Sequence, residues 1–191
     1  NGERMFDIFT SLKDEVIEKM LSHRVDEMQE SGIIEGQKTG EVIRKSKHSW
    51  IHHPSALQDA IYATNIIMRQ EGWNMCLDYI EPLQYTEYYG DETAPGQYGW
   101  HQDSFRPRGD FAKKYDGRIR KVSFSIFLND DYEGGQFDLE NRSPEYKKRH
   151  KTFRKKGRNN IVFFPSWAWH RVRPVTKGTR KSIVGWVLGP P

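Results

Sequence analysis

Residues 120–140 read RKVSFSIFLNDDYEGGQFDLE, and this stretch decides the fold class. Within 119–129, alternate positions are apolar, and the positions between them carry mixed side chains. The apolar set is Val122, Phe124, Ile126 and Leu128. Alternation with a period of two is typical of a β-strand that buries one face. The run DDYEGG at 130–135 predicts a turn, and 136–140 predicts the returning strand.

Helices are expected before this stretch and more strands after it. Ser11 and Asp14 resemble a capping box, and apolar residues at helical spacing follow them, which predicts a helix that ends before Gly32. A second helix is predicted from Pro54 to Gly72. Short strands are expected in the remaining apolar runs, at 33–34, 42–43, 160–164, 169–173 and 180–188.

This order of elements predicts a mainly β chain with N-terminal helices, of the α+β class. We expect a β-sandwich or jelly roll with helices buttressing one sheet. A length of 191 residues suits one domain. Within residues 1–191 we expect helical support over about 10–72 and a jelly-roll core over about 73–191.

Composition excludes several classes of protein. The net charge is +4, but residues 142–158 hold nine Lys/Arg and one Glu, and the rest of the chain is slightly acidic. A general nucleic-acid binder is therefore not indicated. A single cysteine excludes a disulfide framework and a Cys-rich metal site. No apolar run is long enough for a membrane span or a signal-peptide core, so we expect a cytoplasmic chain; its oligomeric state is open.

The basic segment 142–158 is expected to be an exposed loop. Three interpretations remain open: a solvated loop, a surface that steers an acidic peptide or protein substrate, or a nucleic-acid contact. Nucleic acid is the least favoured, because Tyr146 and Phe153 alone interleave the basic residues.

The run YGWHQD at 98–103 contains the pattern H-x-D. Residues i and i+2 of a strand point to the same face, so His101 and Asp103 can reach one ion. His170 follows an apolar run at 161–165. Two imidazoles and one carboxylate suit a non-haem Fe(II) site with open positions for a co-substrate and O₂. Alone, H-x-D is a weak signal, and an isolated His170 is more typical of a structural histidine.

Arg180 adds weight to this interpretation. It shares one face of the last expected strand with Ser182, Val184 and Trp186. An inward-pointing arginine among apolar neighbours needs an anionic partner. If no Asp or Glu supplies that charge, a ligand carboxylate can, held by the guanidinium and the Ser182 hydroxyl. A small dicarboxylate would then bridge from Arg180 to the metal.

These residues resemble the 2-oxoglutarate/Fe(II)-dependent dioxygenases, in particular the prolyl 4-hydroxylase-like branch that includes the PKHD-type hydroxylases. Three blocks carry the resemblance: LQYTEYYGDETAPGQYGWHQD at 83–103, the stretch 120–140, and NNIVFFPSWAWHRVRPVTKGTRKSIVGWVLG at 159–189. The resemblance covers about residues 80–188 and implies a double-stranded β-helix, or jelly roll, with a metal between two sheets.

The resemblance implies roles for individual residues. The implied iron ligands are His101, Asp103 and His170. Arg180, assisted by Ser182, would bind the distal carboxylate of 2-oxoglutarate, and the side chains near the co-substrate would be Tyr88, Tyr98 and Trp186. One position departs from the family: some prolyl hydroxylases have a second co-substrate tyrosine near Phe127, which has no hydroxyl. The implied cofactors are Fe(II), 2-oxoglutarate and O₂, with ascorbate as an optional addition.

The resemblance implies a hydroxylase that couples oxidative decarboxylation of 2-oxoglutarate, to succinate and CO₂, with hydroxylation of a substrate C–H bond. A prolyl residue in a peptide or protein is the first substrate hypothesis. A free amino acid, another small molecule and a nucleobase are alternatives. A catalytically silent jelly-roll binding module is the rival from another class, and the intact set of His101, Asp103, His170 and Arg180 argues against it.

Overall fold

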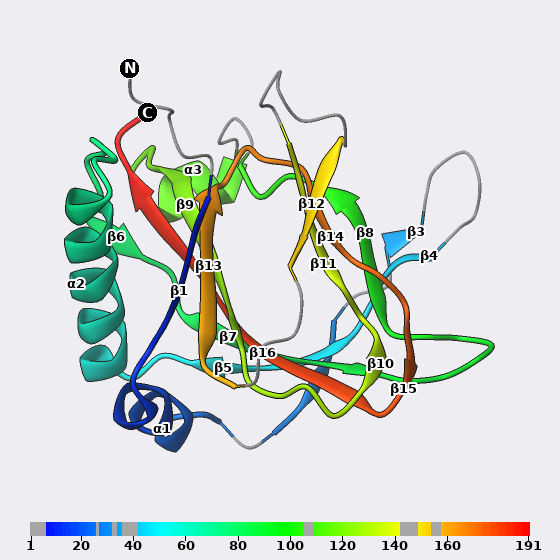
Figure 1. Cartoon of the computed structure of the whole chain (residues 1–191). Helices are drawn as coiled ribbons and strands as arrows, with labels where there is room; N and C mark the ends of the chain where they lie inside the picture. Colours follow the sequence, from blue (N-terminus) through cyan, green and yellow to red (C-terminus); the bar gives the residue numbers. More distant parts are fainter. Residues whose placement is uncertain are drawn as a thin grey trace.

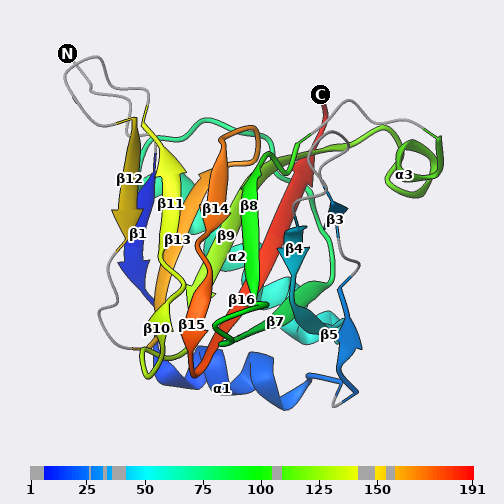
Figure 2. The ribbon, with the colours of Figure 1, turned by 90° about the vertical axis from the view of Figure 1, so that its right-hand side faces the viewer.

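The computed structural model describes residues 7–25, 27–31, 34–35, 42–104, 109–141, 149–153 and 158–191. In these residues two antiparallel sheets form the body of the fold, with a helix beside the larger sheet and a helix at each end of the strands (Figure 1 and Figure 2). Figure 1 shows the larger sheet between helix α2 (Pro54–Gln70) and the smaller sheet. Helix α1 (Asp14–Ser22) lies across one end of the strands, and the short helix α3 (Gly109–Lys114) lies at the other. The expected mainly β jelly roll with N-terminal helices is confirmed.

Both sheets combine strands from distant parts of the chain. In order, the larger sheet consists of β1 (Ile8–Ser11), β13 (Asn160–Pro165), β9 (Ile119–Phe127), β16 (Thr179–Gly189), β7 (Leu83–Tyr89), β5 (Lys47–Ile51) and β2 (Gln29–Glu30), and β6 (Tyr79–Ile80) also pairs with β16. The smaller sheet consists of β12 (His150–Phe153), β11 (Phe137–Glu140), β14 (His170–Val172), β8 (Gln97–His101), β4 (Val42–Lys45) and β3 (Ile34–Glu35). Figure 2 views the smaller sheet from its outer face. A separate pair joins β10 (Glu133–Gly134) to β15 (Val175–Lys177).

The alternation within 119–129 divides strand β9 between two environments. Its apolar set packs in one core with Ile17 of α1 and Ala60 of α2. On the opposite face, Phe127 joins a second core between the sheets, which also contains Phe137 and Phe164. Ser123 and Ser125 share this inner face. A cavity of about 390 Å³ lies between the sheets, and the small side chain of Ser125 is part of its lining.

The first predicted helix is wrong at both ends. Ser11 is not a helix cap, because it is the last residue of β1 and pairs with Asn160 of β13. The helix begins after Lys13, which makes no side-chain capping bond, and it ends at Ser22 rather than near Gly32. Pairing with a distant strand thus overrides the local capping pattern. The second helix lies close to its prediction, with His53 as the cap and Pro54 in the first turn.

The strands within residues 10–72 were expected only in part. Strands β3 and β4 of the smaller sheet lie at or beside the strands expected at 33–34 and 42–43, whereas β2 and β5 of the larger sheet were not expected. In the basic segment, His150–Phe153 forms β12, which pairs with β11, so this part is not a loop. Residues 142–148 and 154–157 of that segment lie outside the described residues. Among the described helices, none has the length and apolarity needed to cross a membrane.

Candidate functional site

The cavity between the sheets gathers side chains from both. His101 and His170 reach it from the smaller sheet, and Arg180, Ser182 and Trp186 reach it from β16 of the larger sheet. Also lining it are Tyr88, Tyr98 and Asp103. All eight side chains singled out in the sequence therefore lie around one space.

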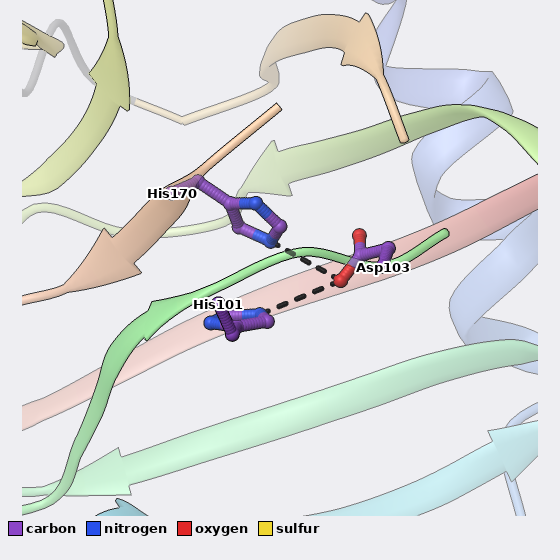
Figure 3. Close-up of side chains that lie close together, drawn as sticks. All are labelled: His101, Asp103 and His170. Carbon is purple, nitrogen blue, oxygen red and sulfur yellow. Dashed lines mark ion pairs between the residues drawn. The ribbon is translucent and has the colours of Figure 1, made fainter. Parts of the chain in front are cut away.

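Three of these side chains form a group that can hold a metal ion. The ligand atoms of His101, Asp103 and His170 all lie within 4.8 Å of one another. Oδ1 of Asp103 is 3.4 Å from Nε2 of His101 and 3.3 Å from Nε2 of His170, as the dashed lines in Figure 3 mark. His101 and His170 are opposite each other in the pairing of β8 with β14. Two imidazole nitrogens and one carboxylate oxygen are a donor set that suits Fe(II).

Backbone carbonyls orient both histidines. Nδ1 of His101 lies 2.7 Å from the carbonyl oxygen of Gly99, and Nδ1 of His170 lies 2.9 Å from that of Ala168. Because a carbonyl oxygen can only accept, each Nδ1 carries the proton. Each Nε2 is then the ring nitrogen that faces Asp103, and it can offer its lone pair to a metal once its proton is displaced. A hydrogen bond from Nδ1 to a carbonyl oxygen is typical of metal-binding histidines.

Asp103 is held by its other oxygen. Oδ2 accepts hydrogen bonds from Oγ of Ser123, at 2.7 Å, and from Nε1 of Trp186, at 3.1 Å. Strand β8 ends at His101, so Asp103 does not belong to the strand as the i, i+2 argument assumes. Its backbone N–H instead donates to the carbonyl oxygen of Ser166, which directs the side chain inward.

Electrostatics keep this carboxyl group ionised. Burial opposes ionisation of Asp103, but the charge of His170 and hydrogen bonds from both histidines outweigh it and hold the pKa well below the usual range. Burial lowers the pKa of His101, and the neighbouring His170 lowers it further. Burial also opposes the charge of His170, yet Asp103 raises the pKa of that imidazole. The group therefore presents a negative oxygen beside two imidazole nitrogens.

Arg180 lies in the same cavity and is 2% exposed. Its Nη1 donates to Oγ of Ser182 at 3.3 Å, but its buried Nε has no hydrogen-bond partner within the described residues. The ring centroids of Tyr88 and Phe127 lie 5.6 and 5.3 Å from its guanidinium carbon. A buried guanidinium with an unused donor fits an anionic ligand such as the carboxylate of 2-oxoglutarate.

The two tyrosines take different positions. Tyr88 is buried, and its pKa is raised to about 12, mainly by burial. Its phenol therefore stays neutral and can donate a hydrogen bond into the cavity. Tyr98 stacks on the ring of His101, with 3.5 Å between centroids. Tyr98 thus supports a histidine, a role that its place in the sequence does not reveal.

The sequence interpretation missed several residues around this cavity. Ser123 and Ser166, whose hydroxyls are 2.9 Å apart, lie behind Asp103. Serines at alternate positions of an otherwise apolar strand, as at 123 and 125, are a signal that could have been read. His48 and Trp50 of β5 also line the cavity. They were missed because the sequence interpretation placed no strand at 47–51, where β5 lies.

A family model described as the 2OG-Fe(II) oxygenase superfamily matches residues 83–188. Among curated proteins, a PKHD-type hydroxylase of Gloeothece citriformis is 39% identical over 92 residues, which cover 47% of this chain and 36% of that relative. The match thus spans little more than a third of that relative's length.

Solved structures share the fold across almost the whole chain. A Pseudomonas putida prolyl-4-hydroxylase superposes with a TM-score of 0.60 at 18% identity, covering 95% of this chain and 91% of that one. A prolyl hydroxylase from Trichoplax adhaerens, in complex with a hypoxia inducible factor oxygen degradation domain peptide fragment, gives a TM-score of 0.60 at 17% identity, covering 95% and 83%. The resemblance inferred from the sequence is confirmed, and the chain belongs to the 2OG-Fe(II) oxygenase superfamily.

Proposed function

We propose that this chain is an Fe(II)- and 2-oxoglutarate-dependent hydroxylase. In this proposal His101, Asp103 and His170 hold the metal, and Arg180 with Ser182 binds the distal carboxylate of 2-oxoglutarate. The observation that carries the proposal is the pairing of two incomplete sites in one cavity. A group of three ligands has its donor atoms within 4.8 Å of one another, and a buried guanidinium has an unused N–H.

When bound, Fe(II) and 2-oxoglutarate would supply the oxidative chemistry: 2-oxoglutarate, O₂ and a substrate C–H bond would give succinate, CO₂ and a hydroxylated carbon, with one oxygen atom entering succinate and the other the hydroxyl group. The chain's own residues arrange these groups. Gly99 and Ala168 fix the protons on the Nδ1 atoms of the two histidines, so that each Nε2 faces the metal position. Phe127 and Tyr88 flank the guanidinium of Arg180 and keep water from the carboxylate that it binds.

We further propose that the substrate is a prolyl residue in a peptide or protein. The prolyl hydroxylases that share this fold support the substrate class, including the one bound to a peptide fragment. The cavity supports it as well, because Trp50 and Trp186 line it and supply apolar aromatic surface for a pyrrolidine ring. At about 390 Å³ the cavity is in the range of small-molecule sites.

The first experiment is an anaerobic titration of metal-free protein with Fe(II) and 2-oxoglutarate, followed by the visible charge-transfer band of the chelate. We expect a band that requires both components and is absent in His170→Ala. Arg180→Met should raise the 2-oxoglutarate concentration for half-saturation by about 10- to 100-fold, because it removes a hydrogen bond to a charged group. Lys181→Met, an exposed neighbour on β16, is the matched control and should leave that concentration unchanged.

A folded protein that gives no band would contradict the proposal and favour the binding-module hypothesis. The substrate is tested separately, by mass spectrometry of proline-containing peptides incubated with Fe(II), 2-oxoglutarate and O₂, with and without ascorbate. We expect a gain of one oxygen atom on a prolyl residue. Turnover of free proline or a nucleobase, with none of the peptides, would reject the prolyl-peptide assignment and leave the hydroxylase assignment standing.

A further inference from the structure

The carboxylate of Asp103 can present one oxygen to a metal because its other oxygen is occupied. Ser123 and Trp186 both donate to Oδ2, and Oδ1 faces the two histidines. Ser123 is fully buried and its hydroxyl also lies 2.9 Å from that of Ser166, so its position is fixed by packing. The indole of Trp186 is only partly buried and must be held in place by something else.

Arg120 is that support. The centre of its guanidinium lies 4.2 Å from the centroid of the Trp186 ring, which is the contact distance of a cation stacked on an aromatic face. Glu81 holds the guanidinium at two points, with Arg120 Nε donating to Oε2 at 2.6 Å and Nη2 to Oε1 at 2.9 Å. A bidentate pair fixes the plane of the guanidinium, and the stacked indole must follow that plane.

We propose that Arg120 and Glu81 are positioning residues, which orient the Trp186 N–H so that Asp103 binds the metal through Oδ1 alone. The inference rests on the proposed function, because it takes Asp103 as a metal ligand. Neither residue of the pair forms a hydrogen bond with His101, Asp103 or His170 among the contacts of the described residues. The charge of Arg120 does act on Asp103, and the Arg120→Lys variant below keeps that charge. The positioning effect passes from Glu81 through Arg120 to the indole, and from its N–H to Oδ2.

A second salt bridge close by provides the matched control. Arg118 binds Asp78 with the same bidentate geometry, at 2.9 and 3.1 Å. That pair lies at the surface and makes no contact with Trp186 among the contacts of the described residues. A substitution of Arg118 therefore removes an equivalent arginine–carboxylate pair, two residues from Arg120, without disturbing the indole of Trp186.

The test is a thermodynamic cycle on metal affinity, measured with Co(II) alone by its visible absorption and by calorimetry. The variants are Arg120→Met combined with Glu81→Gln, which leaves no unpaired buried charge, and Arg120→Lys, which keeps the charge but loses the planar guanidinium. Each is made in the wild type and in Trp186→Phe, which keeps an aromatic ring and lacks the N–H. Circular dichroism checks that each variant is folded.

We expect Trp186→Phe and the Arg120 variants each to weaken Co(II) binding by about tenfold, the lower end of the range for outer partners of metal ligands. In the Trp186→Phe background the Arg120 variants should change the affinity by less than about twofold, because residues that act through one contact are not additive. Arg118→Met should have no effect.

Two results would overturn the inference: unchanged Co(II) affinity in the folded Arg120 variants, or a full additional loss in the Trp186→Phe background. The second result would mean that Arg120 acts on the metal site by another route. Failure of the proposed function would give a different result. Wild-type protein would then bind no Co(II), or His170→Ala would bind Co(II) as tightly as wild type.

Discussion

Asp103 and Asp138 are both buried aspartates beside strand β14. Each contacts one of two adjacent residues of that strand. His170 points into the cavity toward Asp103, and Arg171 points to the outer face toward Asp138. Asp103 is 7% exposed and Asp138 is fully buried. Burial opposes ionisation of both, and in both the neighbours outweigh it and lower the pKa.

The two carboxylates differ in the number of fixed cations around them. Asp138 accepts from Arg171 at 2.7 Å and from Arg173 at 2.6 and 3.2 Å, and Thr152 donates to it as well. Its charge and its acceptor positions are therefore satisfied by the chain. Asp103 accepts from one hydroxyl and one indole, and its second oxygen faces titratable imidazoles. Asp103, which accepts no hydrogen bond from an arginine or lysine among the described residues, is thus the buried carboxylate with an oxygen available to a metal.

The largest expected effect is on metal affinity, and it should occur at only one of the two aspartates. Asp103→Asn should weaken Fe(II) or Co(II) binding by more than about 100-fold, beyond the range for outer partners, because it removes the anionic ligand. Asp138→Asn should leave the affinity within about twofold. The rise in melting temperature on adding metal gives the same comparison, since a ligand stabilises only the form that binds it. Equal loss in both variants would contradict the assignment.

The next effect concerns stability of the metal-free protein. Asp138→Asn should lower the free energy of unfolding by about 2 kcal/mol, below the usual cost of breaking a buried ion pair, because the two arginine side chains are 29% and 35% exposed and can rehydrate. Urea denaturation measures this change. Asp130→Asn, at an exposed turn, is the control with no expected change. An unchanged Asp138→Asn midpoint would show that the pairing adds nothing to stability.

The smallest expected effect is the pH dependence of the stability that Asp138 contributes. The folded pKa of Asp138 is lowered, so its contribution is complete above the unfolded value of about 3.9 and is lost as the pH falls through the folded value. The gap in unfolding free energy between wild type and Asp138→Asn should therefore be constant from about pH 7 to pH 5 and shrink below about pH 4. A gap that widens on acidification would reverse the sign of the pKa shift.

Much of the fold follows from local patterns. The alternation in β9 correctly separates Val122 and Ile126, which pack in the core that contains the helices, from Ser125, which lines the cavity, and Phe127, which lies in the core between the sheets. The pattern fails for β1, where Ile8–Ser11 becomes a strand because its backbone pairs with Ile161 and its neighbours far along the chain. A partner so distant in sequence leaves no local trace.

The same division applies to the site. His101, Asp103, His170 and Arg180 could be predicted because their spacing matches a recurrent motif. The hydrogen-bond donors to Asp103 could not be predicted from the sequence. Ser123 and Trp186 reach its carboxylate only after β8, β9 and β16 have assembled. The Arg120–Glu81 pair likewise joins residues 39 positions apart. A sequence motif can therefore indicate candidate ligands, but the residues that orient those ligands become apparent only in the folded structure.

Strand β16 sets limits on how the length of this chain can vary in evolution. Arg180, Ser182 and Trp186 lie on it and all line the cavity, and it is paired with β7 or β9 along its length. One inserted or deleted residue between Arg180 and Trp186 would reverse the direction of every side chain on one side of the change. Arg180, the proposed anchor of 2-oxoglutarate, and Trp186, which donates a hydrogen bond to Asp103, could then no longer share a cavity. The number of residues between Arg180 and Trp186 is therefore fixed by the cavity that both side chains line.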